Sequence, residues 1–196
     1  MHVANKLKQI RDMNLDIDMI APAHGVIWRS YIPELLQAYE EFATFQSVDK
    51  AVIVYESVWK HTQMMAEALA EGMGRNGVCV KIFKCSMTSP AIIQKELLDA
   101  KAILVGSGNY NNAMSGSIAA FLEKLISCKV KNKKGLGFGS YGWANLVTKE
   151  INARLVKAGI TLLNDEVVSQ NYTPSEEDLD ALMELGKQIA EEIKAM

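Results

Sequence analysis

Short apolar runs alternate with segments of helical periodicity from residue 50 onward. The run at residues 51–55 (AVIVY) is rich in β-branched side chains and too short for a helix, which is typical of a strand buried on both faces. In the segment after it, Met65, Leu69 and Met73 recur every four residues and therefore mark one face of a helix. The same reasoning predicts strands at 51–55, 78–83, 102–105, 135–139 and 161–168, and helices at 62–75, 90–100, 117–127, 145–158 and from 174 onward.

This strict alternation predicts an α/β fold with a doubly wound, five-stranded parallel sheet and helices on both faces. A closed eight-fold barrel needs roughly 250 residues, whereas the alternating segment covers only residues 49–196. Ligands of open α/β sheets bind beyond the carboxyl ends of the strands, where the strand order reverses. The loops after the first, third and fourth strands are therefore the candidates for a binding site.

Residues 1–48 lack this alternation, and we predict that they form a separate unit. Leu7 and Ile10 fall on one face of a short helix, residues 17–21 have the pattern of a strand, and residues 33–45 (PELLQAYEEFATF) that of an amphipathic helix. A piece this short exposes apolar surface unless it packs on the remaining chain or on another copy. Because large exposed apolar patches mark interfaces, we expect a homodimer or a larger assembly.

The composition narrows the class of partner. The 196 residues carry 21 Lys and Arg against 23 Asp and Glu, and a net charge of −2 gives no case for nucleic acid. No apolar run approaches the ~20 residues of a bilayer span, and the first residues lack a secretory signal, so we expect no membrane contact. The three cysteines have no CxxC spacing and indicate buried, reduced thiols of a cytoplasmic protein. The basic residues 129–134 precede the fourth strand and are expected to form a solvated turn on the opposite rim from the candidate loops.

The loop after the first strand combines hydroxyl groups with cations. Ser57 and Thr62 flank Lys60 and His61, and a helix follows directly. The unpaired N–H groups and the dipole at a helix N-terminus favour an anion such as a phosphate. The glycines of a Walker A or GxGxxG motif are missing. The alternative is that Ser57 or Thr62 only caps the helix and that Trp59 belongs to the core.

The other two loops favour a flat heterocycle. Residues 107–113 (SGNYNNA) offer amides and one aromatic ring without a charge, although they also fit a simple Asn-rich turn. Residues 140–144 (SYGWA) place Tyr141 and Trp143 on either side of Gly142, where the rings either stack on a planar ligand or pack into the core. Taken together, the three loops fit a ligand with a phosphate at one end and a polar ring system at the other. Flavin mononucleotide (FMN) is such a ligand.

The same loops resemble those of a known family. The strings YESVWKHT at 55–62, GS and NNAM within 106–114, and FGSYGW at 138–143 look like the three flavin loops of the flavodiiron proteins (A-type flavoproteins). These proteins join a metallo-β-lactamase-like diiron domain to a C-terminal flavodoxin domain. A second match, IAPAHGVIWR at 20–29, looks like the end of the diiron domain. The resemblance implies a flavodoxin-like sheet of strand order 2-1-3-4-5 at 49–196, preceded by a remnant of the diiron domain at 1–48.

For matching positions the resemblance implies FMN as the cofactor and assigns its contacts by loop. The first loop would hold the phosphate, the second would line the isoalloxazine and ribityl groups, and the third would flank the ring. Lys60 and His61 depart from the family, which commonly has small or polar residues there, and the Gly-Asn-Tyr at 108–110 also differs from the usual run. The expected cofactor-binding residues are Ser57, Val58, Trp59, Lys60, His61, Thr62, Ser107, Gly108, Asn109, Tyr110, Asn111, Ser140, Tyr141, Gly142 and Trp143.

The family's iron ligands are the point at which this chain departs most. The upstream H-x-E-x-D-H cluster does not occur in the sequence, and His24 matches only the last ligand. One histidine does not hold a diiron pair, so we expect no metal site in this chain and treat His24 as an orphan ligand. The resemblance then implies an electron carrier that works with a redox partner such as rubredoxin or a reductase. We do not expect the chain alone to reduce oxygen or nitric oxide.

Two other functions stay open at this point. A flavin-dependent NAD(P)H:quinone reductase uses the same fold, and a binding module without cofactor would need only the surface of the fold. A signalling receiver domain also alternates strands and helices, but it needs an acidic pair after the first strand and an aspartate after the third. Here Glu56 stands alone and the third strand ends in Gly106 and Ser107, which argues against a receiver.

Overall fold

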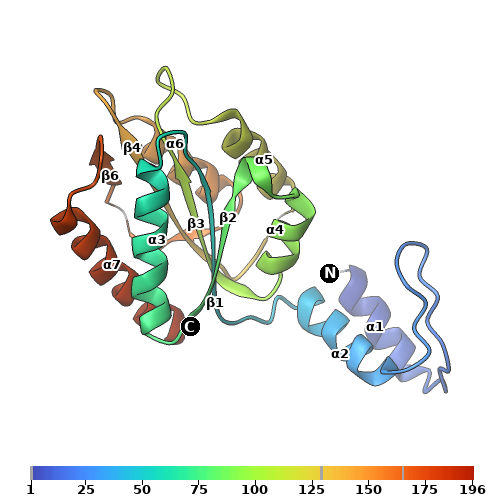
Figure 1. The fold of residues 1–196 in the computed structure, drawn as a ribbon. Helices are drawn as coiled ribbons and strands as arrows, with labels where there is room; N and C mark the ends of the chain where they lie inside the picture. The colour runs from blue at the N-terminus through green and yellow to red at the C-terminus, as the bar shows by residue number, and fades with distance from the viewer. Residues whose placement is uncertain (1, 129, 165) are drawn as a thin grey trace. The chain divides into compact units, whose positions relative to one another are not determined.

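The computed structural model describes residues 2–128, 130–164 and 166–196. The chain divides into two compact units, Met1–Gln46 and Ser47–Met196 (Figure 1). The larger unit contains a parallel sheet with the strand order β2-β1-β3-β4-β5, and a further strand, β6, also pairs with β4. The strands are β1 Val48–Glu56, β2 Cys79–Lys84, β3 Ala100–Ser107, β4 Lys134–Tyr141, β5 Thr161–Leu162 and β6 Val168–Asn171. The predicted doubly wound α/β sheet and its order are thus confirmed.

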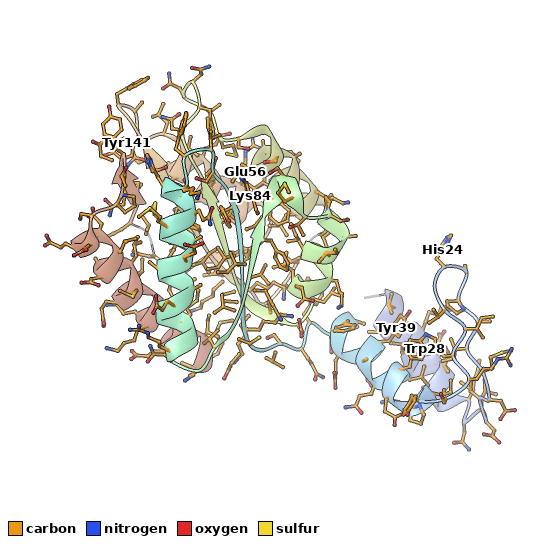
Figure 2. All side chains as sticks on the ribbon, viewed as in Figure 1. His24, Trp28, Tyr39, Glu56, Lys84 and Tyr141 are labelled. Carbon is orange, nitrogen blue, oxygen red and sulfur yellow. The ribbon has the colours of Figure 1, made fainter. Side chains whose placement is uncertain are left out.

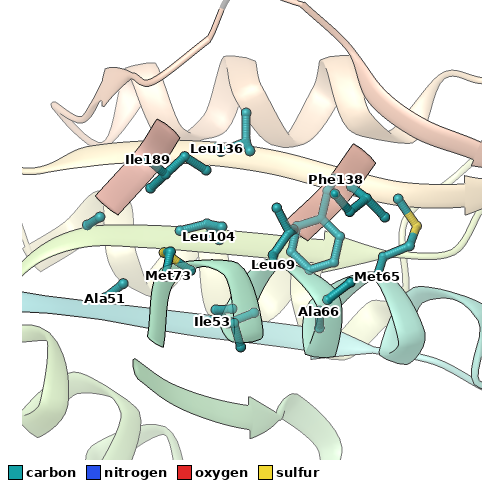
Figure 3. Packing of buried hydrophobic residues seen from close by; sticks show 14 of the residues in the cluster. Ala51, Ile53, Met65, Ala66, Leu69, Met73, Leu104, Leu136, Phe138 and Ile189 are labelled. Atoms are coloured by element: carbon teal, nitrogen blue, oxygen red, sulfur yellow. The ribbon is translucent and has the colours of Figure 1, made fainter. Parts of the chain in front are cut away.

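Helices cover both faces of this sheet because its central strands are apolar on both sides. In β1, Ile53 faces the layer that contains α3 and α7, whereas Val52 and Val54 face the layer that contains α4, α5 and α6. Figure 3 shows the first layer, in which Met65 and Leu69 of α3 pack over the sheet. The helices are α3 His61–Arg75, α4 Pro90–Leu97, α5 Gly116–Cys128, α6 Val147–Lys157 and α7 Glu176–Lys194, and a short 3-10 turn covers Cys85–Met87.

The helices α3 and α7 lie side by side and approach closely through two glycines (Figure 1). A Cβ atom on Gly72 would lie 2.0 Å from the carbonyl oxygen of Met183, and one on Gly186 would lie 2.5 Å from that of Leu69. Because no side chain fits between the two backbones, both positions require glycine. This contact fixes α7 against α3, the helix whose N-terminus faces the candidate site.

The predicted strand 161–168 is wrong as one element, because the structure has two short strands there. Thr161 and Leu162 pair with the start of β4, and Val168–Asn171 pairs with its end. In the described residues between them, the backbone N–H of Glu166 donates to Oδ1 of Asn164 over 2.9 Å. Asparagine side chains that accept such local bonds favour turns over strands. The second strand therefore ends three residues later than predicted.

Lys133 departs from the expected solvated basic turn at 129–134, of which residue 129 lies outside the described residues while residues 131 and 132 are exposed. Lys133 is only 4% exposed, and its Nζ donates to the carbonyl oxygens of Ala100 (2.6 Å) and Leu98 (3.2 Å). Burial lowers the pKa of Lys133 to about 8. Neighbouring Lys50 is paired with Glu96 (2.7 Å) and Asp99 (2.8 Å). The lysine thus ties the start of β4 to the turn before β3.

The cysteines are less buried than predicted. Cys79 and Cys128 are exposed and Cys85 is half-buried, and all three are free. Cys79 begins the edge strand β2, and Cys128 ends α5, where its Sγ accepts from Nε2 of Gln94 over 3.4 Å. Burial raises the pKa of Cys85, whose Sγ lies 3.4 Å from the carbonyl oxygen of Ser117.

The smaller unit consists of α1 (His2–Asp12), α2 (Ile32–Ala43) and the loop between them. Instead of the strand predicted at 17–21, the loop has a single antiparallel bridge between Ile20 and Trp28. A lone two-stranded ribbon is marginal in water, and the described part of this unit offers the segment no third strand. Among the described hydrophobic residues of this unit, only Ile32 is buried. The described part of the unit therefore leaves many apolar side chains exposed.

Candidate functional site

The loops after β1, β3 and β4 meet at the carboxyl edge of the sheet and enclose a cavity of about 220 Å³. All predicted site residues line it except Lys60, Ser107 and Asn111. The cavity also includes Tyr172, which the sequence did not suggest. Its lining residues are Ser57, Val58, Trp59, His61, Thr62, Gly108, Asn109, Tyr110, Ser140, Tyr141, Gly142, Trp143 and Tyr172.

The N-terminus of α3 opens onto this cavity without a side-chain cap. Lys60 is the N-cap residue in the left-handed conformation (φ 67°) and makes no side-chain capping bond, and among the described residues no side chain is seen to accept from the first turn. The helix begins its backbone bonding with Met64, whose N–H donates to the carbonyl of Lys60 over 2.9 Å. The N–H groups of His61, Thr62 and Gln63 therefore have no acceptor within the helix. The capping role considered for Ser57 or Thr62 is wrong, and the helix end is free to bind an anion.

Thr62 joins the first loop to the third. It is only 1% exposed, and its Oγ1 lies 2.9 Å from Oγ of Ser140. A hydrogen bond between two hydroxyls leaves each one a free lone pair or proton for a ligand. The bond holds the start of α3 against the end of β4.

A buried carboxylate supports the first loop from below. Glu56 is 8% exposed and accepts from the N–H of Ser57 (3.2 Å), the N–H of Ser86 (2.9 Å) and Oγ of Ser117 (3.1 Å). Burial alone would raise the pKa of Glu56, but these hydrogen bonds outweigh it and hold the pKa below its ordinary value. Figure 2 shows Lys84 beside Glu56, and its Nζ lies 3.8 Å from the carboxylate. The ionised carboxylate thus fixes the backbone from which the loop departs.

The loop after β3 is fixed by internal hydrogen bonds. Ser107 is fully buried, its Oγ donates to the carbonyl of Gly108 (2.8 Å) and accepts from the N–H of Ser115 (3.0 Å), and it does not reach the cavity. The N–H of Asn109 donates to the carbonyl of Ser140 over 3.0 Å, while its side-chain Nδ2 donates to the carbonyl of Ala144. The Oδ1 of Asn109 is a buried acceptor that has no donor among the described residues. Asn111 is exposed in a left-handed turn (φ 52°) outside the cavity.

Two tryptophans extend from the cavity rim into solvent. Trp59 is 79% exposed and Trp143 is 90% exposed, so the alternative that these rings belong to the core is wrong. Tyr141, on the same loop as Trp143, is half-buried (Figure 2). Burial raises the pKa of Tyr110, which lines the opposite wall. Exposed aromatic rings around a cavity are typical of a site that covers a planar ligand.

Known proteins share this arrangement of strands and loops. The flavodoxin family profile matches residues 53–186. The chain belongs to the flavodoxin family. A flavodoxin from the domain Archaea superposes with a TM-score of 0.68 at 32% identity, over 74% of this chain and 99% of that one.

The similarity to other members of the flavodoxin family extends through both units. A protein named nitric oxide reductase from Moorella thermoacetica is 40% identical over 191 residues, which are 97% of this chain and 48% of that protein. The rubredoxin oxygen:oxidoreductase of Desulfovibrio gigas superposes with a TM-score of 0.91 at 30% identity, over 98% of this chain and 48% of that one. These two matches over nearly the whole chain confirm the predicted resemblance. The flavodiiron protein of Giardia intestinalis shares the fold over 98% of this chain, with a TM-score of 0.90 at 22% identity. The chain spans about half the length of the curated relatives it matches.

In the smaller unit of this flavodoxin-family chain, His24 lies at the tip of the loop between α1 and α2 and is exposed (Figure 2). Among the residues that the structure describes, no group of three or more His, Cys, Asp or Glu side chains is placed to hold a metal ion. Within the same described ranges, no helix is both long and apolar enough to cross a membrane.

Proposed function

We propose that the larger unit binds FMN in the cavity at the carboxyl edge of the sheet and that the chain transfers electrons between protein partners. The observation that carries this proposal is the meeting of two features on one cavity. An uncapped helix N-terminus faces one part of it, and exposed aromatic rings surround another. A phosphate suits the first feature and a flat, polar ring system suits the second.

The phosphate would be held mainly by neutral donors. The free N–H groups at the start of α3 point to the anion, and the hydroxyls of Ser57 and Thr62 lie on the same wall. Lys60 adds positive charge at the helix end. The buried carboxylate of Glu56 lies beneath this loop. The phosphate would therefore be bound by the helix dipole and by hydroxyl groups, and not by an ion pair with a buried cation.

The ring would lie between the second and third loops. Asn109 and Tyr110 provide an amide and a hydroxyl, and Tyr141 and Trp143 provide aromatic surface beside Gly142. When bound, FMN supplies reversible electron transfer, and the protein tunes its potential through stacking and local charge. No side chain of the cavity needs to act as a general acid or base for that role.

The partners of such a carrier are part of the proposal. The names of the relatives include rubredoxin oxygen:oxidoreductase and flavorubredoxin, so rubredoxin or a reductase is the partner class to test first. The apolar surface of the smaller unit supports a homodimer or larger assembly. A light-scattering mass of a monomer would contradict that assembly.

Absorption spectroscopy of the reconstituted chain tests the proposal. The purified protein is incubated with excess FMN, desalted, and scanned in the visible range, with riboflavin treated in parallel. We expect about one FMN retained per chain and much less riboflavin, because riboflavin lacks the phosphate that the helix end binds. Loss of all FMN on desalting would contradict the proposal and favour the binding module. Rapid NAD(P)H oxidation without a protein partner would instead favour the quinone reductase.

A further inference from the structure

The loop between β6 and α7 forms a fourth wall of the cavity. It begins with Tyr172 and Thr173, directly after Asn171 at the end of β6, and it lies outside the three loops that follow β1, β3 and β4. Tyr172 lines the cavity and is 56% exposed. The ring therefore borders the space that we assign to FMN without belonging to either hydrophobic layer of the fold.

Hydrogen bonds attach this loop to two of the other walls. The N–H of Tyr172 donates to the carbonyl of Tyr141 over 2.8 Å, and Nδ2 of Asn171 donates to the carbonyl of Gly142. On the other side, Oγ1 of Thr173 lies 3.0 Å from Nε2 of His61, at the start of α3. The position of Tyr172 is thus set by the same segments that would hold the flavin.

The backbone of Tyr172 adopts a conformation that tyrosine rarely takes. Its φ of 59° lies in the left-handed region, which costs free energy for any residue with a Cβ and which glycine adopts freely. Its ring lies against Gly142, where an added Cβ would be 3.4 Å from Cε1 of Tyr172. A strained backbone that holds a half-exposed ring at a cavity is typical of a functional position.

We propose that Tyr172 is a flavin-contacting residue and that its ring covers part of FMN bound in the cavity. This inference rests on the proposed function. Its warrant is the joint placement of the ring, which lines the cavity, packs on Gly142 and is fixed to Tyr141 through the backbone. The loop 171–173 is thereby a fourth recognition segment for the cofactor.

A substitution to glycine separates the ring contact from a role in folding. Tyr172→Gly removes the ring but suits the left-handed backbone, so it should not lower the denaturation midpoint of the chain without FMN. It should raise the Kd for FMN about 2- to 12-fold, the range expected for one lost aromatic contact. Tyr172→Phe, which keeps the ring, should stay within about twofold of the natural chain.

The matched control is Tyr31→Gly in the smaller unit. Tyr31 is also left-handed (φ 57°) and 70% exposed, so its replacement makes the same chemical change outside the cavity. We expect no change in Kd for this control. FMN titration, followed by flavin fluorescence, gives the Kd of all four full-length proteins, and a urea titration without FMN gives their midpoints.

The outcomes are distinct for the two proposals. If the natural chain binds no FMN, the proposed function fails. If it binds FMN and Tyr172→Gly binds as tightly as Tyr31→Gly, the assignment of Tyr172 is overturned. Weaker binding together with a lowered midpoint, or equal losses in Tyr172→Phe and Tyr172→Gly, would also overturn it, because the ring contact would not be the cause.

Discussion

Lys133 provides a prediction whose magnitude follows from the structure. In the folded chain the pKa of this buried lysine is about 8, whereas an unfolded chain has the ordinary 10.5. Between these values the unfolded state binds more protons, so the free energy of unfolding rises as the pH rises. The full pKa difference of about 2.5 units corresponds to about 3 kcal/mol, by which the lowered pKa reduces the free energy of unfolding at neutral pH. Between pH 7 and pH 9.5 the free energy of unfolding should regain about 2 kcal/mol of this loss.

The comparison with Lys133→Met isolates this contribution. The variant has no proton to lose at this position, so its unfolding free energy should lack the rise of about 2 kcal/mol. Its absolute stability is not the test, since the carbonyls of Leu98 and Ala100 lose their donor. Lys131→Met, at an exposed position two residues earlier, serves as the control and should keep the rise.

Urea denaturation followed by circular dichroism at pH 7, 8, 8.5, 9 and 9.5 measures the effect. Lys50 has a raised pKa, and its ion pairs with Glu96 and Asp99 stay intact over this range. Other groups that titrate between pH 7 and 9.5 cancel when the variants are compared with the natural chain. Equal slopes of unfolding free energy against pH for Lys133→Met and the natural chain would refute the argument that burial lowers the pKa of Lys133.

Three further predictions concern the cavity and the helix that faces it. Thr62→Val removes one hydroxyl of the pair that Thr62 forms with Ser140. We expect FMN retention to fall about tenfold in a desalting assay, since a hydrogen bond to a charged group is worth ~1.5–3 kcal/mol. Unchanged retention would show that Thr62 does not bind the phosphate. Trp143→Ala should leave the denaturation midpoint of the apoprotein nearly unchanged, because the ring is 90% exposed, and should shift the flavin midpoint potential in a spectroelectrochemical titration; an unshifted potential would exclude the ring contact. Gly72→Ala should destabilise the fold by about 1–3 kcal/mol in urea, whereas Gly74→Ala, with open space around it, should stabilise it by up to ~1 kcal/mol; equal effects would contradict the close helix contact.

The strands of the central sheet could be predicted because both of their faces are covered by helices and must therefore be apolar. Residues 51–55 and 102–105 are apolar throughout, as a strand covered on both sides requires. The glycine-rich segment 135–139 has weak strand propensity, and the structure explains why it is tolerated. A Cβ on Gly137 would lie 2.6 Å from Oδ1 of Asn152, which accepts from the Gly137 N–H over 2.7 Å. Tertiary packing, which local propensity does not contain, selects glycine there.

The errors arise where a local pattern depends on distant partners. Lys133 has the appearance of a solvated charge in a basic run, but the carbonyls of Leu98 and Ala100, just before and at the start of β3, accept from it. Residues 17–21 have a strand pattern, yet within the described smaller unit only Trp28 pairs with Ile20. In both cases a partner distant in the chain decides the structure, and the sequence near the residue does not reveal that partner.

The candidate site was likewise predictable in part, namely in the position of its loops but not in every residue that lines it. The position of three loops follows from chain connectivity, because every parallel strand of an open sheet ends at the same edge. Which residues of those loops face the cavity depends on hydrogen bonds within each loop, so Ser107 turns inward to Ser115 while Asn109 and Tyr110 line the cavity. Tyr172 was missed because the predicted last strand ended at residue 168, which left residues 169–173 without an assigned edge. The pairing of β6 with β4 carries that segment to the cavity, and pairing between strands is the part of a parallel sheet that no single segment encodes.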